Sequence, residues 1–283
     1  MERQRRPVLR DVARLADVSL TTASIVLNGK AGANIPPETQ ARVFAAAAAL
    51  GYRPNAMARG LRRQRSDTVG LISDEIATTP FAGQMLQGAQ DAAWESGVVL
   101  LLVNTGRDPA IEARAFDVME ERQVDAIVYA TMAHRLIEPP PRLRGFRAVL
   151  LDAEAADGSL PSVVPDELGG ARYAVERLVA AGHHRIGMIS TREPGPATER
   201  RQEAYEQVLT EHGLAADLMA FGERGTVDGG FAAASLLLDR PDRPTAVFCF
   251  NDRMAMGAYR AARVRGLRVP HDLSVVGFDD MEQ

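Results

Sequence analysis

The stretch LRDVARLADVSLTTASIVLNG, residues 9–29, decides how the N-terminal part of the chain folds. Apolar side chains recur at helical spacing from Leu9 to Ala16, and this pattern breaks at Asp17. Ser19 then offers a side-chain oxygen to the first amides of a second helix, expected over residues 20–28 and ended by Gly29. The stretch therefore predicts two short helices joined by a tight turn.

Two helices in this order form a helix-turn-helix, in which the N-terminal residues of the second helix reach base edges in the major groove of DNA. The side chains expected there are Leu20, Thr21, Thr22, Ser24 and Ile25. The side chains expected to face inward are Ala23, Val26 and Leu27. The alternative is a generic three-helix bundle whose polar side chains are merely solvated, because helix-turn-helix spacing is common.

Outward from this stretch, the sequence predicts a third helix over residues 38–50, ended by Gly51, and a basic linker from Pro54 to Arg65 that folds only on contact with a partner. Residues 1–67 carry a net charge of +7, whereas the remaining 216 carry −11, giving −4 for the chain. A basic head on an acidic body is expected where only one end meets a polyanion.

Three segments of the head closely resemble the lactose-repressor family: Leu9-Arg10-Asp11-Val12-Ala13, Val26-Leu27-Asn28-Gly29 and Leu50-Gly51-Tyr52-Arg53-Pro54-Asn55-Ala56. The resemblance implies that the segment after the third helix becomes a hinge helix on operator DNA, where Leu61 wedges into the minor groove. It adds Asn55, Ala58, Arg59 and Leu61 to the expected DNA-binding residues. The alternative for Leu61 is a linker leucine packed on the core. Ala23 and Ile25 depart from the family's usual residues, so the operator sequence is left open.

Beyond Thr68 short apolar runs alternate with amphipathic stretches, a pattern typical of parallel sheets covered by helices. The expected strands are 69–73, 98–103, 126–131, 149–151, 185–190, 246–250 and 274–278. The expected helices are 83–96, 110–122, 168–181, 198–212, 231–238 and 254–265. Turn residues at 157–162 indicate a crossing between two lobes.

The predicted fold is an all-α helix-turn-helix head followed by an α/β core of two doubly wound parallel-sheet lobes. The expected domains are a head (1–54), a hinge helix or linker (55–67), an N-terminal lobe (68–162) and a C-terminal lobe (163–283). The family resemblance continues through Asn251-Asp252-Arg253-Met254-Ala255-Met256-Gly257 and Val275-Val276-Gly277-Phe278-Asp279-Asp280. It implies a core similar to periplasmic sugar-binding proteins, with a ligand held between the lobes.

Polar side chains at strand ends are the candidates for binding this effector: Asp74, Asp152, Asn251 and Asp279, joined by Arg201 and, as an apolar face, Phe81. Carboxylates, an amide and a guanidinium suit the vicinal hydroxyls of a sugar. The alternative for each polar residue is to cap the following helix. We expect capping for Asp252 and ligand contact for Asn251, Arg201 and Asp279. Phe81 packed into its own lobe is almost as good an interpretation.

The sequence thus predicts a DNA-binding transcription regulator, a repressor whose homodimer binds double-stranded operator DNA under the control of a small molecule such as a sugar. A sugar-binding protein without DNA activity would not need the basic head. An enzyme is not expected, because no nucleophile with a base, no metal-ligand cluster and no glycine-rich phosphate loop is present. No cofactor or metal is expected either.

The remaining expectations concern the environment of the chain and its C-terminal end. Cys249 is the only cysteine and is expected to be a buried thiol. The sequence contains no apolar run of the roughly 20 residues that cross a membrane and no signal peptide, so a cytoplasmic protein is expected. The chain stops soon after Asp280, whereas family members continue for several tens of residues. This end suggests a truncated product that dimerises poorly.

Overall fold

The computed structural model describes residues 7–28, 35–53, 65–75 and 80–281, without the side chains of residues 80–82. The chain divides into two compact units, Met1–Ser66 and Asp67–Gln283. Within these described ranges, no helix combines the length and the apolar character needed to cross a membrane.

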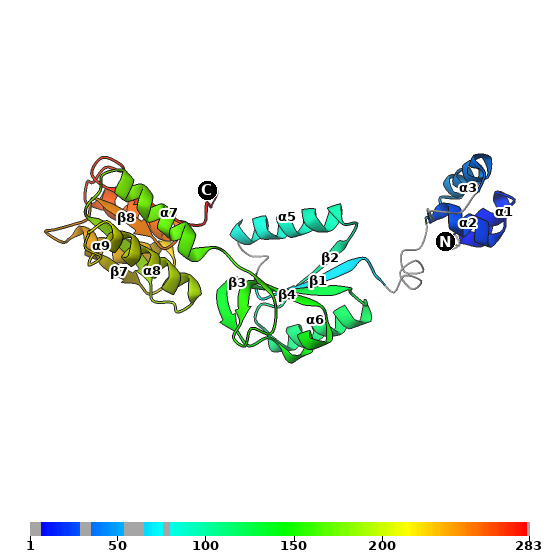
Figure 1. Cartoon of the computed structure of the whole chain (residues 1–283), viewed down its shortest axis with the longest axis horizontal. Coiled ribbons are helices and arrows are strands. Elements are labelled where there is room, and N and C mark those ends of the chain that lie inside the picture. The colour runs from blue at the N-terminus through cyan, green and yellow to red at the C-terminus, as the bar shows by residue number, and fades with distance from the viewer. Residues whose placement is uncertain (1–6, 29–34, 54–64, 76–79, 282–283) are drawn as a thin grey trace. The chain divides into compact units, whose positions relative to one another are not determined.

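The first unit contains α1 (Leu9–Leu15), α2 (Leu20–Leu27) and α3 (Pro37–Leu50), which Figure 1 labels. Their shared core includes Val12, Ala23 and Val43, all fully buried. Gly51 ends α3 with φ 62°, a left-handed conformation that glycine adopts without steric cost. The three helices expected from the sequence are confirmed to within one residue, whereas Gly29 and the basic linker lie outside the described residues.

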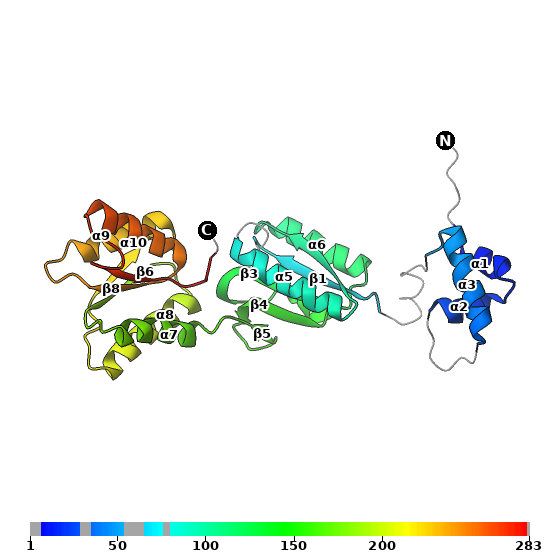
Figure 2. The ribbon, with the colours of Figure 1, turned by 90° about the horizontal axis from the view of Figure 1, so that it is seen from above.

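The second unit begins with a parallel sheet in the order β2-β1-β3-β4-β5. Its strands are β1 (Thr68–Ser73), β2 (Val99–Asn104), β3 (Ala126–Ile137), β4 (Ala148–Ala155) and β5 (Ser162–Val163). Leu71 and Ile72 are adjacent on β1 and point to opposite faces of the sheet. Leu71 packs with α5 (Pro80–Glu95), and Ile72 packs in the cluster that contains α6 (Pro109–Glu121), so one helix covers each face (Figures 1 and 2). Residues 67–163 are called the first lobe below.

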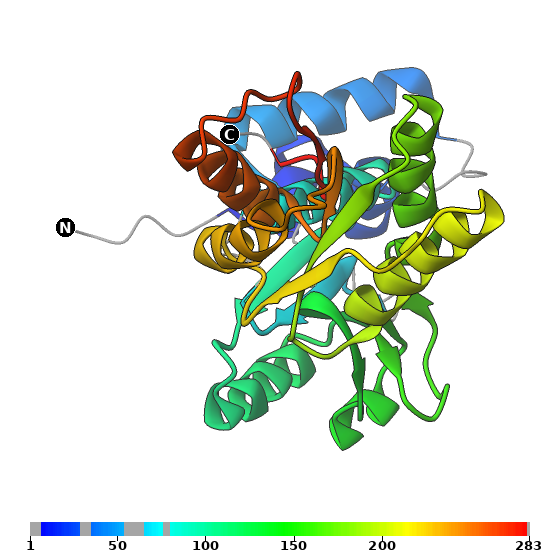
Figure 3. The same ribbon diagram turned by 90° about the vertical axis from the view of Figure 1, so that its left-hand side faces the viewer.

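A second parallel sheet follows in the order β7-β6-β8-β9. Its strands are β6 (Ile186–Thr191), β7 (Met219–Gly222), β8 (Ala246–Cys249) and β9 (Ser274–Val276). The helices α7 (Glu167–Ala180) and α8 (Pro196–Glu211) cover one face, and α9 (Val227–Leu238) and α10 (Asp252–Val264) cover the other, as Figure 3 shows. Residues 164–281 are called the second lobe. The predicted class, a helical head and two doubly wound lobes, is confirmed.

The differences from the sequence expectation lie at strand ends and in short strands. The strands β3 and β4 extend beyond their expected ends at Thr131 and Leu151, and an irregularity between Ala130 and Arg135 interrupts their register. The short strands β5 and β7 were not expected. Because β5 pairs with β4, the chain leaves the first sheet after Val163, and the turn at residues 157–162 is not the crossing between the lobes.

Candidate functional site

The N-terminal end of α2 carries the candidate DNA contacts. Ser19 caps the helix: its hydroxyl oxygen accepts from the Thr22 amide at 3.0 Å and lies 2.8 Å from the Thr22 hydroxyl. Leu20 and Thr21 are exposed, whereas Thr22 is half-buried and engaged with the cap. The cap therefore fixes the first turn of α2 and leaves Leu20 and Thr21 accessible.

Ser24 and Ile25 are less accessible than their expected role requires. Ser24 is 9% exposed, and the Asn28 amide lies 2.7 Å from its carbonyl oxygen and 3.4 Å from its hydroxyl. This contact favours a structural role for Ser24 on the inner side of α2. Ile25 is half-buried, and Ala23 and Val26 face inward as expected. The other candidates, Asn55, Ala58, Arg59 and Leu61, lie outside the described residues.

In the second lobe, the candidate Arg201 on α8 is buried, with 5% of its surface exposed. Its Nε donates to a Glu167 carboxylate oxygen at 2.7 Å, and one terminal nitrogen donates to the Phe250 carbonyl. The guanidinium also lies over the rings of Phe278 and Phe250, at 3.7 and 4.6 Å from their centroids. These contacts hold the guanidinium plane in one orientation.

Asp279 lies near Arg201, and Asp152 is a buried candidate carboxylate of the first lobe. Asp279 follows β9 and approaches Arg201 to 3.7 Å, and burial raises the pKa of its carboxyl to about 6. Asp152 is 3% exposed, and burial raises its pKa to about 6 as well, against smaller lowering contributions from His134 and Arg201. One Asp152 carboxylate oxygen is buried without a hydrogen-bond partner. An unpartnered buried acceptor of this kind is available to a ligand hydroxyl.

The location of Asp152 differs from the expectation. The residue lies inside β4 instead of at its end, and its φ of 56° is left-handed. This conformation is uncommon for residues other than glycine and is tolerated best by Asp and Asn. Asp279 also has a positive φ, 106°. Both carboxylates thus lie on backbone that departs from ordinary strand geometry, as often happens at binding sites.

The capping role expected for Asp252 belongs to Asn251 in the structure. Asn251, not Asp252, caps α10: its side-chain oxygen accepts from the Met254 amide at 2.8 Å, and its amide nitrogen donates to the Gly225 carbonyl at 3.0 Å. Asp252 instead accepts from the Met281 amide at 2.8 Å. The Asn251 amide has a second N–H, so its use in ligand binding stays a prediction.

The structure places Asp74 just after β1, in contact with Arg135 and with Arg107 at 3.5 Å. Arg135 also makes a minor contribution that lowers the pKa of Asp152. Arg135 therefore interacts with both candidate carboxylates of the first lobe, Asp74 and Asp152. Phe81 lies in the first turn of α5, but its side chain is not among the described ones.

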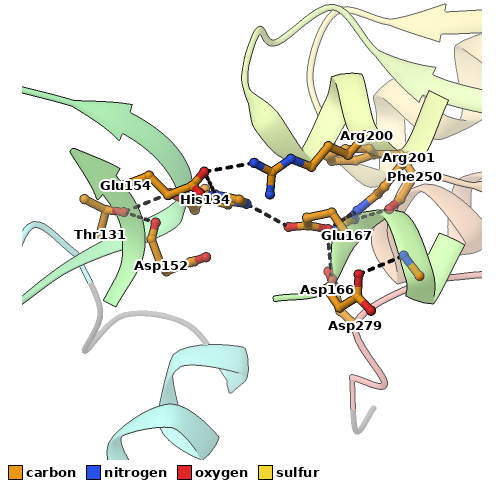
Figure 4. A network of polar contacts seen from close by, with 12 residues as sticks. Thr131, His134, Asp152, Glu154, Asp166, Glu167, Arg200, Arg201, Phe250 and Asp279 are labelled. Atoms are coloured by element: carbon orange, nitrogen blue, oxygen red, sulfur yellow. Dashed lines mark hydrogen bonds and ion pairs between the residues drawn. The ribbon is translucent and has the colours of Figure 1, made fainter. Parts of the chain in front are cut away.

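A set of charged residues that was not expected from the sequence lies between the two sheets, and its members His134, Glu167 and Arg201 are buried (Figure 4). His134 on β3 lies 2.9 Å from Glu154 through Nε2 and 3.5 Å from Glu167 through Nδ1. Glu154 on β4 also pairs with Arg200 at 3.1 Å, and Glu167 pairs with Arg201. No local pattern marks these residues, because their partners lie 20 to 46 positions away in sequence.

Taken together, the described candidates offer the Asp279 carboxylate beside the Arg201 guanidinium, which lies over two aromatic rings, and an unpartnered Asp152 oxygen from the first lobe. Paired donors and acceptors beside an apolar ring match a polyhydroxylated ring compound. Within the described ranges, no group of three or more His, Cys, Asp or Glu side chains could hold a metal ion.

Both units of the chain match models of known protein families. Residues 8–55 match the family model for bacterial regulatory proteins of the lacI family, and residues 66–283 match the model for periplasmic binding proteins and the sugar-binding domain of the LacI family. Catabolite control protein A of Priestia megaterium is 34% identical over 279 residues, which cover 95% of this chain and 81% of that protein.

Two solved structures are similar to nearly the whole chain. A crystal structure of the lac repressor dimer bound to operator and an anti-inducer has a TM-score of 0.78 and 27% identity, covering 98% of this chain and 84% of that one. A complex of the transcriptional regulator CelR with cellobiose has a TM-score of 0.63 and 32% identity, covering 97% of this chain and 83% of that one.

Proposed function

The chain belongs to the lacI family of transcription regulators, and we propose from this premise that it is a homodimeric repressor whose affinity for operator DNA is controlled by a neutral sugar. The observation that carries the proposal is the approach of Asp279 to the Arg201 guanidinium, which lies over two phenylalanine rings. The unpartnered oxygen of Asp152 in the first lobe adds a buried acceptor. The similar CelR complex, which contains cellobiose, supports a sugar as the ligand class.

The proposed binding to operator DNA is supported by features of the head, residues 1–67. Leu20 and Thr21 are exposed at the capped start of α2, and the first 67 residues carry a net charge of +7. Positive charge supplies affinity for phosphates and makes it dependent on salt, whereas the α2 side chains supply contacts with base edges. A similar structure of the lac repressor dimer with operator supports both the DNA and the dimer.

A neutral effector is favoured over an anionic one by the charges already present. Arg135, Arg200 and Arg201 are each bound to a carboxylate. The buried carboxyls of Asp152 and Asp279 have raised pKa values, so the site already disfavours negative charge. A phosphorylated sugar would add up to two negative charges beside them. Sugar hydroxyls instead use the unpartnered acceptors without adding charge.

The test of the effector site is titration calorimetry of the chain with neutral mono- and disaccharides and with the corresponding sugar phosphates. We expect binding of a neutral sugar and no binding of its phosphate. Asp279→Asn should weaken binding at least tenfold, because a charge-assisted hydrogen bond contributes about 1.5–3 kcal/mol. Asp280→Asn is the matched control, since Asp280 is the exposed neighbour. Equal effects of the two variants would contradict the assignment.

A further inference from the structure

His134 lies at the meeting of the two lobes and is almost completely enclosed, with a side chain 1% exposed. Its Nε2 lies 2.9 Å from Glu154 of the first lobe, and its Nδ1 lies 3.5 Å from Glu167, the first residue of α7 in the second lobe. Nδ1 has no hydrogen-bond partner in this arrangement, although Glu167 is 1% exposed and directly opposite (Figure 4).

The protonation state of the ring decides what it can do between two carboxylates. A neutral imidazole donates from one nitrogen only and presents a lone pair at the other, which would face a carboxylate oxygen. The imidazolium donates from both nitrogens, so it can bind Glu154 and Glu167 at once. Histidine is also the side chain that changes charge in the physiological pH range.

We propose that His134 is a proton-dependent brace, which joins the first lobe to the second by binding Glu154 and Glu167 together when its ring is protonated. Because Glu167 also binds Arg201, His134 is a positioning residue: it fixes the orientation of the Arg201 guanidinium through Glu167. The inference does not depend on which ligand the protein binds.

The backbone around the ring supports a connection between the lobes at this point. A Cβ atom placed on Gly195, the residue before α8, would lie 3.5 Å from the His134 carbonyl oxygen. Arg200 on α8 reaches Glu154 at 3.1 Å, so a second ion pair crosses between the lobes beside His134. The His134 contact is the buried one of the two, whereas the Arg200 side chain is 40% exposed.

Charged side chains surround the His134 ring on several sides. On β4, Asp152 and Glu154 face the ring, and Glu167 faces it from α7. Arg200 and Arg201 on α8 bind two of these carboxylates. Arg135 is the neighbour on β3, and it binds Asp74. The hydrogen bond from His134 is the largest cause that lowers the pKa of Glu154, which is consistent with a donating Nε2.

The experiment measures the separation of the lobes in the free protein, so that it does not require a known effector. Glu121→Cys on α6 and Glu206→Cys on α8 place spin labels on exposed positions of the two lobes, and native Cys249 is buried. Double electron–electron resonance should give one narrow distance distribution at about pH 6 and a broader one at about pH 8.5.

Two variants separate the brace from its neighbours. His134→Gln should give the broad distribution at both pH values, because glutamine cannot carry the charge that binds both carboxylates. Arg200→Gln should broaden the distribution but keep its dependence on pH, since the His134 contacts remain. His184→Gln is the matched control, because His184 is exposed. Thermal unfolding of each variant checks that it folds.

A His134→Gln protein that folds and keeps the narrow distribution of the parent at about pH 6 would overturn the proposal. A parent distribution that does not change with pH would overturn it equally. Failure of sugar binding in the calorimetric test would contradict the proposed effector but would leave this result unaffected.

Discussion

At the residue scale, the candidate site is built from carboxyls whose burial is unfavourable. Asp152 has an ordinary pKa of 3.8 and a pKa of about 6 in the folded protein, because burial disfavours its charged form. The folded state therefore holds the proton more tightly than the unfolded state. The stability that the protonated Asp152 carboxyl contributes is fully present below about pH 4 and is lost as pH rises to about 6.

Replacing Asp152 with Asn should stabilise the protein at neutral pH. Ionising Asp152 in the folded state costs about 3 kcal/mol, so Asp152→Asn should raise the free energy of unfolding by about 1–3 kcal/mol above pH 7. Asparagine also tolerates the left-handed φ of this position. Urea unfolding at about pH 7.5 and about pH 5 measures the effect, which should be smaller at the lower pH. A less stable Asp152→Asn protein at neutral pH would contradict the argument.

The residues of the site were predictable from sequence only where they belong to a local motif. Asn251 and Asp279 each belong to a sequence motif that follows an apolar run. His134 and Glu167 acquire their meaning from contacts between two sheets. Nothing within a few positions of either residue indicates those contacts.

At the element scale, the second lobe depends on a close approach of α9 and α10. A Cβ atom on Gly257 of α10 would lie 2.3 Å from the Val227 carbonyl oxygen and 2.4 Å from the Phe231 amide nitrogen. Both contacts are with backbone, which cannot rotate away as a side chain can. Only glycine therefore allows the two helices to pack at this distance.

Replacing Gly257 with Ala should separate α9 from α10. Overpacking of this kind costs about 1–3 kcal/mol, so the midpoint of thermal unfolding should fall by several degrees. Gly88→Ala on α5 is the control, because a Cβ atom there meets nothing within 4 Å. Gly88→Ala should instead stabilise the helix by about 0.5–1 kcal/mol. Similar unfolding midpoints for the two variants would argue against close packing of α9 on α10.

The cap of α2 gives a second prediction at this scale. Ser19→Ala removes the acceptor of the Thr22 amide, which should cost about 1 kcal/mol of helix stability. Ser19→Asp should restore the cap. Amide hydrogen exchange across residues 22–27 measures the local opening, which should become faster in Ser19→Ala and return toward the parent rate in Ser19→Asp. Unchanged exchange in Ser19→Ala would show that the cap does not hold this turn.

The helices were easier to predict than the strands because their signals are local. Ser19 and Gly51 mark helix ends through their own side chain or conformation. The strands β5 and β7 pair with β4 and β6, and both are too short, at two and four residues, to show a periodic pattern of their own. The extension of β3 to Ile137 depends on a register irregularity that only the partner strand reveals.

At the scale of the whole molecule, a basic DNA-binding head and a core similar to periplasmic binding proteins belong to one chain. Catabolite control protein A is similar to 95% of this chain, so the two units occur together in this family. Effector control requires that the ligand change the DNA affinity, and coupling free energies of this kind are typically about 1–3 kcal/mol. The operator affinity should therefore change about 5- to 150-fold when the core is saturated with effector.

The head also determines how binding responds to salt. Its net charge of +7 over residues 1–67 predicts an affinity for duplex DNA that falls steeply as salt is raised. If Thr21 contacts bases, as we propose, Thr21→Ala should reduce the preference for the selected operator over random duplex DNA and leave the salt dependence unchanged. Fluorescence anisotropy at several salt concentrations separates the two quantities. An unchanged preference for the operator would exclude Thr21 as a contact with the bases.

The most direct test of the central claim is selection of binding sites by the full chain from a pool of random DNA duplexes, with and without a mixture of neutral sugars. We predict enrichment of a palindromic site, with two half-sites for two heads, and a clear change in binding to that site when one sugar is present. Failure to enrich any site at low salt, or a selected site whose affinity no sugar changes, would contradict this prediction.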